Sequence, residues 1–143
     1  MFPPNRSKLS VVRANIWRND EEGGVDMPDL AEQAAVKYFA GWRAKDFETV
    51  RSVLADEVTF HGPLAQLEGA DACVDGLRKM SEIVTDIEIR KRFVDGEDVL
   101  TWFNLHTSVA PPIPTANWST VRDGRIVAIR VAFDPRPLFG PSE

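Results

Sequence analysis

The sequence contains two titratable side chains at positions suited to proton-transfer chemistry. His61 stands at the end of a short expected strand, and an imidazole titrates near neutral pH. Asp134 follows the last expected strand, where apolar neighbours can raise the pKa of a carboxyl toward that of a general base. Each has a structural interpretation as well: His61 as an ordinary loop residue, and Asp134 as an Asp-Pro turn that pairs with Arg136.

Other polar groups have positions from which they can orient a ligand. Tyr38 and Trp42 are four residues apart, so both can point into one pocket. The same spacing is typical of a plain core stripe, and both interpretations stay open. Asn117 and Ser119 alternate along an expected strand, so they share one of its faces.

The composition narrows the classes of function. The 143 residues carry a net charge of −5 without a Lys/Arg cluster, so we expect no nucleic-acid partner. Cys73 is the only cysteine and the two histidines lack the spacing of ligands, so we expect no metal. A Gly-rich phosphate loop, a Ser-His-Asp arrangement and a membrane-length apolar stretch are all missing from the sequence. We therefore expect a cytoplasmic protein without a cofactor.

Helices are expected in the first part of the chain. Apolar residues at every fourth position predict a helix from about 26 to 42, and Asp46 is a suitable N-cap for a second one to residue 54. A 4-3-4 spacing of apolar residues predicts a third helix over 73–84. Residues 27–138 would form one domain, with an N-terminal extension of residues 1–26 that docks through Ile16 and Trp17, and a C-terminal tail of residues 139–143.

Strands dominate the rest of the sequence. β-branched and aromatic residues between turn signals predict a short strand and four longer ones, over residues 58–60, 87–94, 99–109, 116–122 and 125–133. Helices followed by a strand meander indicate an α+β fold. We expect a curved antiparallel sheet of four or five strands with about three helices on its concave side.

Two registers are open for the last hairpin. A two-residue turn at Asp123-Gly124 places Asn117 on the same face as Asp134. A three-residue loop from Arg122 places Asn117 on the same face as Phe133 instead, and this register gives the more continuous apolar surface. In the second register Asp134 points outward unless a bulge turns it in.

The aromatic residues divide between the two faces of the expected sheet. On one strand, Phe103 and Leu105 alternate with Trp102 and His106, and the apolar pair is expected to face the helices. Trp102, His106 and Trp118 would then lie on the outer face. Large aromatic side chains on an outer face are typical of an interface, so we predict a homodimer through these three residues.

The order and spacing of several segments resemble SnoaL-like domains of the nuclear-transport-factor-2-like (NTF2-like) superfamily over about residues 28–138. The segments are Tyr38-Phe39, Lys45-Asp46-Phe47, Leu54-Ala55-Asp56-Glu57-Val58-Thr59-Phe60, Gly69-Ala70, Asp123-Gly124-Arg125-Ile126 and Phe133-Asp134. The resemblance implies a cone that encloses an apolar pocket, in most cases within a homodimer. Such folds host enzymes as well as pure binders, so the fold alone does not fix the function.

The resemblance also implies roles for individual residues. Tyr38 matches the oxyanion-hole Tyr of ketosteroid isomerase, and Asn117 lies near the place of its protonated Asp. Gly62 stands where the general-base Asp of that enzyme would be, so this base is missing. Asp134 matches the acid/base Asp of the SnoaL-like polyketide cyclases. The Asp-Arg-Asp set of limonene-type epoxide hydrolases cannot be assembled from these strands.

Two hypotheses for function follow. The first is a cofactor-independent isomerase or cyclase that moves a proton on a hydrophobic carbonyl or polyketide-like substrate, with the catalytic residues Asp134, His61, Tyr38 and Asn117. The second is a non-catalytic protein or accessory subunit that binds a small ligand. In both, the contacts with the small hydrophobic molecule are expected from Trp42, Phe60, Phe103, Leu105, Ser119 and Phe133. A carboxylate or imidazole that opens into the pocket would favour the enzyme.

Overall fold

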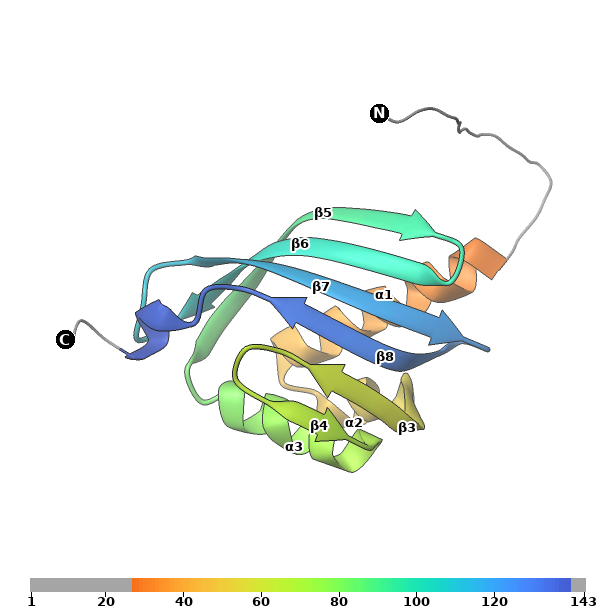
Figure 1. The fold of residues 1–143 in the computed structure, drawn as a ribbon, viewed down its shortest axis with the longest axis horizontal. Coiled ribbons are helices and arrows are strands. Elements are labelled where there is room, and N and C mark those ends of the chain that lie inside the picture. The colour runs from red at the N-terminus through yellow and green to blue at the C-terminus, as the bar shows by residue number, and fades with distance from the viewer. Residues whose placement is uncertain (1–26, 140–143) are drawn as a thin grey trace.

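The computed structural model describes residues 27–139, which fold into three helices and a curved sheet (Figure 1). The helices are α1 (Met27–Ala44), α2 (Phe47–Ser52) and α3 (Ala70–Met80). The strands are β3 (Leu54–His61), β4 (Gln66–Glu68), β5 (Val84–Asp95), β6 (Asp98–Thr107), β7 (Ile113–Arg122) and β8 (Arg125–Ala132), and a 3-10 helix (Arg136–Phe139) ends the described chain. The predicted extension, with Ile16 and Trp17, lies outside these residues.

The α+β cone is confirmed, but its sheet is mixed rather than purely antiparallel. Its six strands have the order β4-β3-β8-β7-β6-β5. All neighbours are antiparallel except β3 and β8, which run parallel. The parallel pair joins segments from opposite ends of the domain, so no local pattern in the sequence reveals it.

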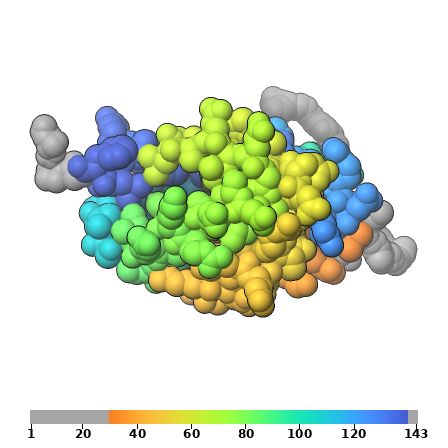
Figure 2. Space-filling model, turned by 90° about the horizontal axis from the view of Figure 1, so that it is seen from below, coloured from red at the N-terminus to blue at the C-terminus, as the bar shows by residue number. Residues whose placement is uncertain are grey.

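The helices lie against the concave face of the sheet. Helix α1 crosses β5 to β8 on this face, while α3 packs on β3 and β4 (Figure 1). Seen from below, the helices and β4 cover the inside of the cone (Figure 2). The buried side of α1 holds residues three and four apart, as a helix with one apolar face requires: Ala31, Ala34, Ala35, Tyr38, Phe39 and Trp42.

Two predicted helices are shorter in the structure than in the sequence analysis. Helix α2 begins after Asp46, whose carboxylate accepts a hydrogen bond from the Thr49 amide at 3.3 Å, and it ends at Ser52. Leu54 belongs to β3 instead, because it pairs with Ile126 of β8. In the same way Val84 opens β5 rather than closing α3. Apolar residues at an element boundary fit both periodicities, and tertiary pairing decides between them.

The last hairpin combines features of both predicted registers. Asp123 and Gly124 have positive φ angles of 55° and 79°, as a two-residue turn of type I′ requires, and Val121 pairs with Ile126. A β-bulge then shifts the register by one residue, so that Thr120 pairs with Ala128. Beyond the bulge, the inward-facing residues of β7 and β8 are those expected for the three-residue loop.

The end of the described chain returns to the body of the domain. Leu138 in the 3-10 helix packs against the core, whereas its neighbour Phe139 is exposed. None of the described helices is both long and apolar enough to cross a membrane. The 3-10 helix follows β8, a central strand of the sheet, and lies beyond its end (Figure 1).

Candidate functional site

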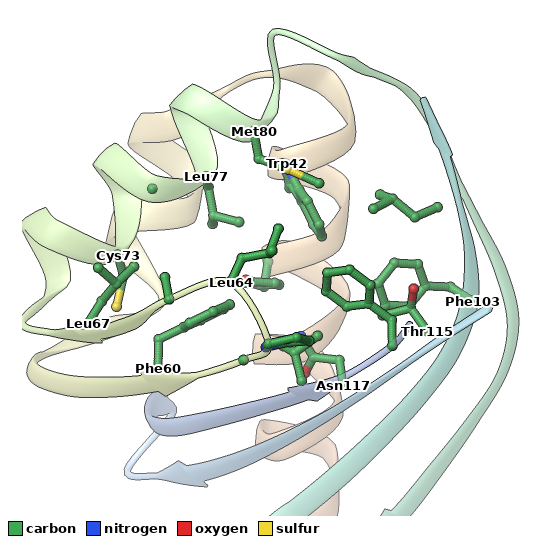
Figure 3. Close-up of a pocket in the computed structure, with 18 residues that line it drawn as sticks. Trp42, Phe60, Leu64, Leu67, Cys73, Leu77, Met80, Phe103, Thr115 and Asn117 are labelled. Carbon is green, nitrogen blue, oxygen red and sulfur yellow. The ribbon is translucent and has the colours of Figure 1, made fainter. Parts of the chain in front are cut away.

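A cavity of about 120 Å³ lies between the helices and the concave face of the sheet. Side chains from α1, α3, β3 and the central strands converge on it (Figure 3). The sequence analysis predicted seven of its lining residues: Tyr38, Trp42, Phe60, Phe103, Leu105, Asn117 and Phe133. Most of the lining is aliphatic or aromatic, so the cavity suits a molecule with a large apolar surface.

Two residues of the lining carry buried hydrogen-bond donors that have no partner in the described chain. They are the Tyr38 hydroxyl (Oη) and the Trp42 indole nitrogen (Nε1), both of which are buried. An unpaired buried polar group costs about 1–3 kcal/mol, so native structures leave few of them without a reason. Burial also raises the pKa of Tyr38, with a further contribution from Cys73, and the phenol therefore stays protonated.

Asn117 is held by its neighbour on the same face of β7. The Ser119 hydroxyl donates a hydrogen bond of 2.9 Å to Asn117 Oδ1, and both side chains are buried. This bond directs the carbonyl of the amide toward Ser119 and leaves its NH₂ group for the cavity that Asn117 lines. Ser119 therefore stands behind Asn117 rather than in the lining, where the sequence analysis expected it.

The two proton-transfer candidates lie away from this cavity. Asp134 forms an ion pair with Arg136, and hydrogen bonds from Arg136 lower the pKa of Asp134 to about 2. This is the Asp-Pro turn that competed with the catalytic interpretation. His61 is exposed and belongs to the end of β3, where it is not part of the lining. The structure thus brings Tyr38, Trp42 and Asn117 together and leaves Asp134 and His61 outside.

Sequence reasoning missed the side of the cavity that α3 and the β3–β4 hairpin form, which comprises Gly62, Pro63, Leu64, Ala65, Leu67, Cys73, Gly76, Leu77 and Met80. It also missed two lining residues of the sheet, Thr115 on β7 and Val131 on β8. The 4-3-4 spacing that predicted α3 already places Cys73, Leu77 and Met80 on one face, and this was the available signal. Strand β4 has only three residues, too few for a periodicity to show.

Comparison with protein families matches the SnoaL-like domain to residues 35–129. The chain belongs to the SnoaL-like domain family. A protein from Kribbella flavida DSM 17836 shares 30% identity with it at a TM-score of 0.71, over 75% of this chain and 88% of that one. No curated protein matches the sequence.

Two further solved structures show the same NTF2-like fold. An M. tuberculosis LEH-like epoxide hydrolase is 25% identical, with a TM-score of 0.67, and the match covers 78% of this SnoaL-like chain and 87% of the hydrolase. TerC, co-crystallised with polyporic acid, is 16% identical at a TM-score of 0.69, with 77% of this chain and 95% of TerC covered. The resemblance predicted from the sequence is thereby confirmed.

The lone thiol of this SnoaL-like domain also faces the cavity. Cys73 is 2% exposed, and burial raises its pKa to about 11. At neutral pH it is therefore a protonated thiol, which packs as a small apolar group rather than acting as a nucleophile. Within residues 27–139, no three side chains of His, Cys, Asp or Glu are grouped to hold a metal ion.

The outer face of the sheet carries the aromatic residues that the sequence analysis placed there. Trp102 and Trp118 are 43% and 44% exposed. The Arg130 guanidinium stacks on the Trp118 ring at 3.7 Å, while Trp118 Nε1 donates to Asp98 at 2.9 Å, so this ring is held in place. His106 also faces outward, where its Nε2 lies 3.0 Å from Glu88 Oε1.

Proposed function

We propose that this SnoaL-like domain binds a small, mainly apolar molecule in the cavity between its helices and its sheet. The observation that carries the proposal is the lining itself, in which the aromatic and aliphatic side chains of both layers surround a preformed space. Ligand sites in proteins combine such an apolar wall with a few polar groups that set orientation. Asn117, in the lining on the side of the sheet, supplies a polar group of this kind.

The volume of the cavity limits the size of the ligand. An engineered protein cavity of about 150 Å³ holds a benzene molecule, so about 120 Å³ limits the buried part of the ligand to about one ring. TerC, which has the same fold, was crystallised with polyporic acid, and this supports a ligand-binding role for the fold.

Proton transfer on a bound carbonyl compound, as in an isomerase or a polyketide cyclase, is the second candidate. It is favoured by the position of Tyr38 and Asn117 in the lining, since donors there can stabilise an enolate. No residue is assigned as the base of such a reaction, because Asp134 is paired with Arg136 and His61 lies outside the lining of the cavity. Binding without catalysis therefore fits the arrangement better.

We also propose that the protein forms a homodimer through the outer face of its sheet. Trp102 and Trp118 lie there half-exposed beside Leu100, and a monomer would leave this apolar surface in water.

The cytoplasmic location stays a prediction from the sequence.

The binding proposal is tested with a panel of neutral one-ring compounds, by thermal shift and by isothermal titration calorimetry. We expect several of them to raise the midpoint of unfolding of the full chain. Leu77→Phe adds volume inside the cavity and should weaken binding at least tenfold. The matched control Val36→Phe, at an exposed position of α1, should bind as the parent does. Binding that survives Leu77→Phe unchanged would place the ligand elsewhere and refute the proposal.

The second candidate has its own readout. A protein that moves a proton next to a carbonyl group exchanges deuterium from D₂O into the α-carbon of a bound ketone, and NMR follows this exchange. Exchange above the rate in buffer, lost in Tyr38→Phe, would support catalysis. Binding of ligands without accelerated deuterium exchange would support a binding function without catalysis.

A further inference from the structure

We propose that the ligand of the cavity is a ring compound with an alkyl chain, in which the ring fills the cavity and the chain leaves it beside Leu64, in the loop between β3 and β4. Any polar group of the ring then points inward, and the apolar chain covers the surface around the mouth of the cavity. This inference rests on the proposed binding function and specifies the class and the orientation of its ligand.

The exposure of the lining residues indicates where the cavity opens. Phe103 and Asn117 are each 1% exposed, so the cavity is closed on the side of the central strands. Leu64 also lines the cavity (Figure 3), but it is 47% exposed, and its neighbour Pro63 is exposed as well. A side chain that meets both the cavity and the solvent stands at a mouth. The cavity therefore opens beside the loop between β3 and β4.

The polar side chains that could contact a ligand lie at the closed side of the cavity. Thr115 and Asn117, both on β7, are each 1% exposed. At the mouth, Pro63, Leu64 and Ala65 have purely apolar side chains, and no Lys, Arg, His, Asp or Glu belongs to the lining within the described chain. A ligand with one polar and one apolar end therefore matches this lining when its polar end points inward.

The volume of the cavity places the chain of such a ligand outside. About 120 Å³ holds about one ring, so each further methylene group has to lie in the mouth or beyond it. A methylene group that leaves water for an apolar contact strengthens binding by up to about fourfold. A chain is therefore favourable wherever apolar surface of the protein receives it.

Apolar side chains continue from the mouth over this end of the domain. Val109, between β6 and β7, is 53% exposed, and Phe139 in the 3-10 helix is 70% exposed. The β6–β7 segment, the β3–β4 loop and the 3-10 helix lie at the same end of the domain (Figure 1, Figure 2). Water solvates such a surface poorly, and a chain that emerges beside Leu64 covers it without a break from the cavity outward.

The experiment compares 4-methylphenol, 4-propylphenol and 4-pentylphenol as ligands of the full chain by isothermal titration calorimetry. The phenol hydroxyl both donates and accepts, so it suits the closed side, where Thr115 donates its own proton to the carbonyl oxygen of Ile113 and can still accept. We expect affinity to rise at least about tenfold from 4-methylphenol to 4-pentylphenol. A smaller rise, or a fall, would mean that the chain stays in water and would overturn the inference.

Substitutions test where the chain lies. Leu64→Ser removes apolar surface at the mouth, so it should reduce the gain from 4-methylphenol to 4-pentylphenol at least threefold, and Phe139→Ser takes its place if it does not fold. Leu77→Phe, inside the cavity, should instead weaken all three phenols. The matched control Val36→Ser, on the exposed side of α1, should keep the gain of the parent protein. An unchanged gain in the mouth variant would overturn the inference.

NMR determines the direction in which the molecule is bound. We expect nuclear Overhauser contacts from the terminal methyl group of 4-pentylphenol to the δ-methyl groups of Leu64, and from its ring protons to Leu77, which is 6% exposed. The reverse pattern, with the terminal methyl group at Leu77 and the ring at Leu64, would show that the chain enters first. That result would also overturn the inference.

The outcomes separate this inference from the proposed function. If none of the three phenols and no compound of the one-ring panel binds, the proposed function itself fails. If 4-methylphenol binds but the chain adds nothing, the cavity is a binding site and only the inference about the chain is wrong. A second copy of the protein could cover the same surface instead. A lower mass of Leu64→Ser than of the parent protein in sedimentation equilibrium would show this and overturn the inference.

Discussion

Arg136 holds the carboxylate of Asp134 at both oxygens: its Nε lies 2.9 Å from Oδ1 and its Nη2 lies 2.7 Å from Oδ2. The backbone amide of Arg136 also donates to Oδ1. The carboxylate is therefore fully engaged where the chain leaves the sheet, and it does not face the cavity.

The ion pair predicts a measurable titration. Hydrogen bonds from Arg136 lower the pKa of Asp134 from 3.8 to about 2, so Arg136→Ala should raise it toward the ordinary value. Because the folded state has the lower pKa, the pair stabilises the protein above pH 3.8, and this contribution disappears as the pH falls toward 2. NMR of the ¹³C-labelled carboxyl groups measures the shift. An unchanged pKa of Asp134 in Arg136→Ala would contradict the assignment.

The same ion pair predicts the effect of Asp134→Asn on binding. Since Asp134 lies outside the cavity lining, affinity for one-ring ligands should stay within twofold of the parent protein. Calorimetry of the variant beside Leu77→Phe provides the comparison. A large loss of affinity in Asp134→Asn would restore this residue as a member of the site.

The core of the cone should be sensitive to the loss of side-chain volume. Leu54 opens β3 and is 0% exposed, so Leu54→Ala should lower the free energy of unfolding by about 2–5 kcal/mol. Leu30 on α1 is 42% exposed, and Leu30→Ala should change the free energy of unfolding by less than about 0.5 kcal/mol. Urea denaturation measures both. Similar values for the two variants would mean that β3 is not packed as described.

The Cys73 thiol offers a probe of the cavity, because it is the only cysteine in the chain. Its pKa of about 11 and its burial predict slow reaction with DTNB at pH 8, faster reaction as the pH rises toward 11, and rapid reaction after unfolding in urea. A bound ligand should slow the reaction further. Labelling of the native protein as fast as that of the unfolded chain would show that the thiol is open to solvent.

The proposed dimer predicts the molecular mass of the protein in solution. Trp118→Glu places a carboxylate next to Asp98 on the apolar outer face and should give a monomer in sedimentation equilibrium. Leu30→Glu, on the exposed side of α1, is the control and should sediment as the parent does. Circular dichroism checks that both variants are folded. A Trp118→Glu variant with the mass of the parent protein would exclude this interface.

Much of the fold follows from local patterns in the sequence. The stripe that contains Tyr38 and Trp42 predicted α1 and its buried face, and alternation along β6 placed Phe103 inside and Trp102 outside. These features depend on neighbours within one element. The parallel pairing of β3 with β8 and the bulge in the last hairpin depend on contacts between distant segments, and the sequence does not show them.

The candidate site shows the same division. Alternation predicted that Asn117 and Phe133 share a face, but only the three-dimensional structure shows that Ser119 turns the Asn117 amide. Asp134 was expected in the site because of its place after the last strand. Its partner Arg136 is two residues away, so the competing turn interpretation was available from the sequence and is the one the structure shows.

The parallel pairing of β3 with β8 has a consequence for the order of events during synthesis. Strand β8 lies between β3 and β7, so the early half of the chain has no place in the sheet until nearly the last described residues are made. Chains emerge from the ribosome N-terminus first, and contacts between distant segments form slowly. The nascent chain therefore carries β3 and its neighbour β4 apart from the other strands of the sheet until β8 arrives. A chain truncated before Arg125 should be aggregation-prone and unable to form the cavity.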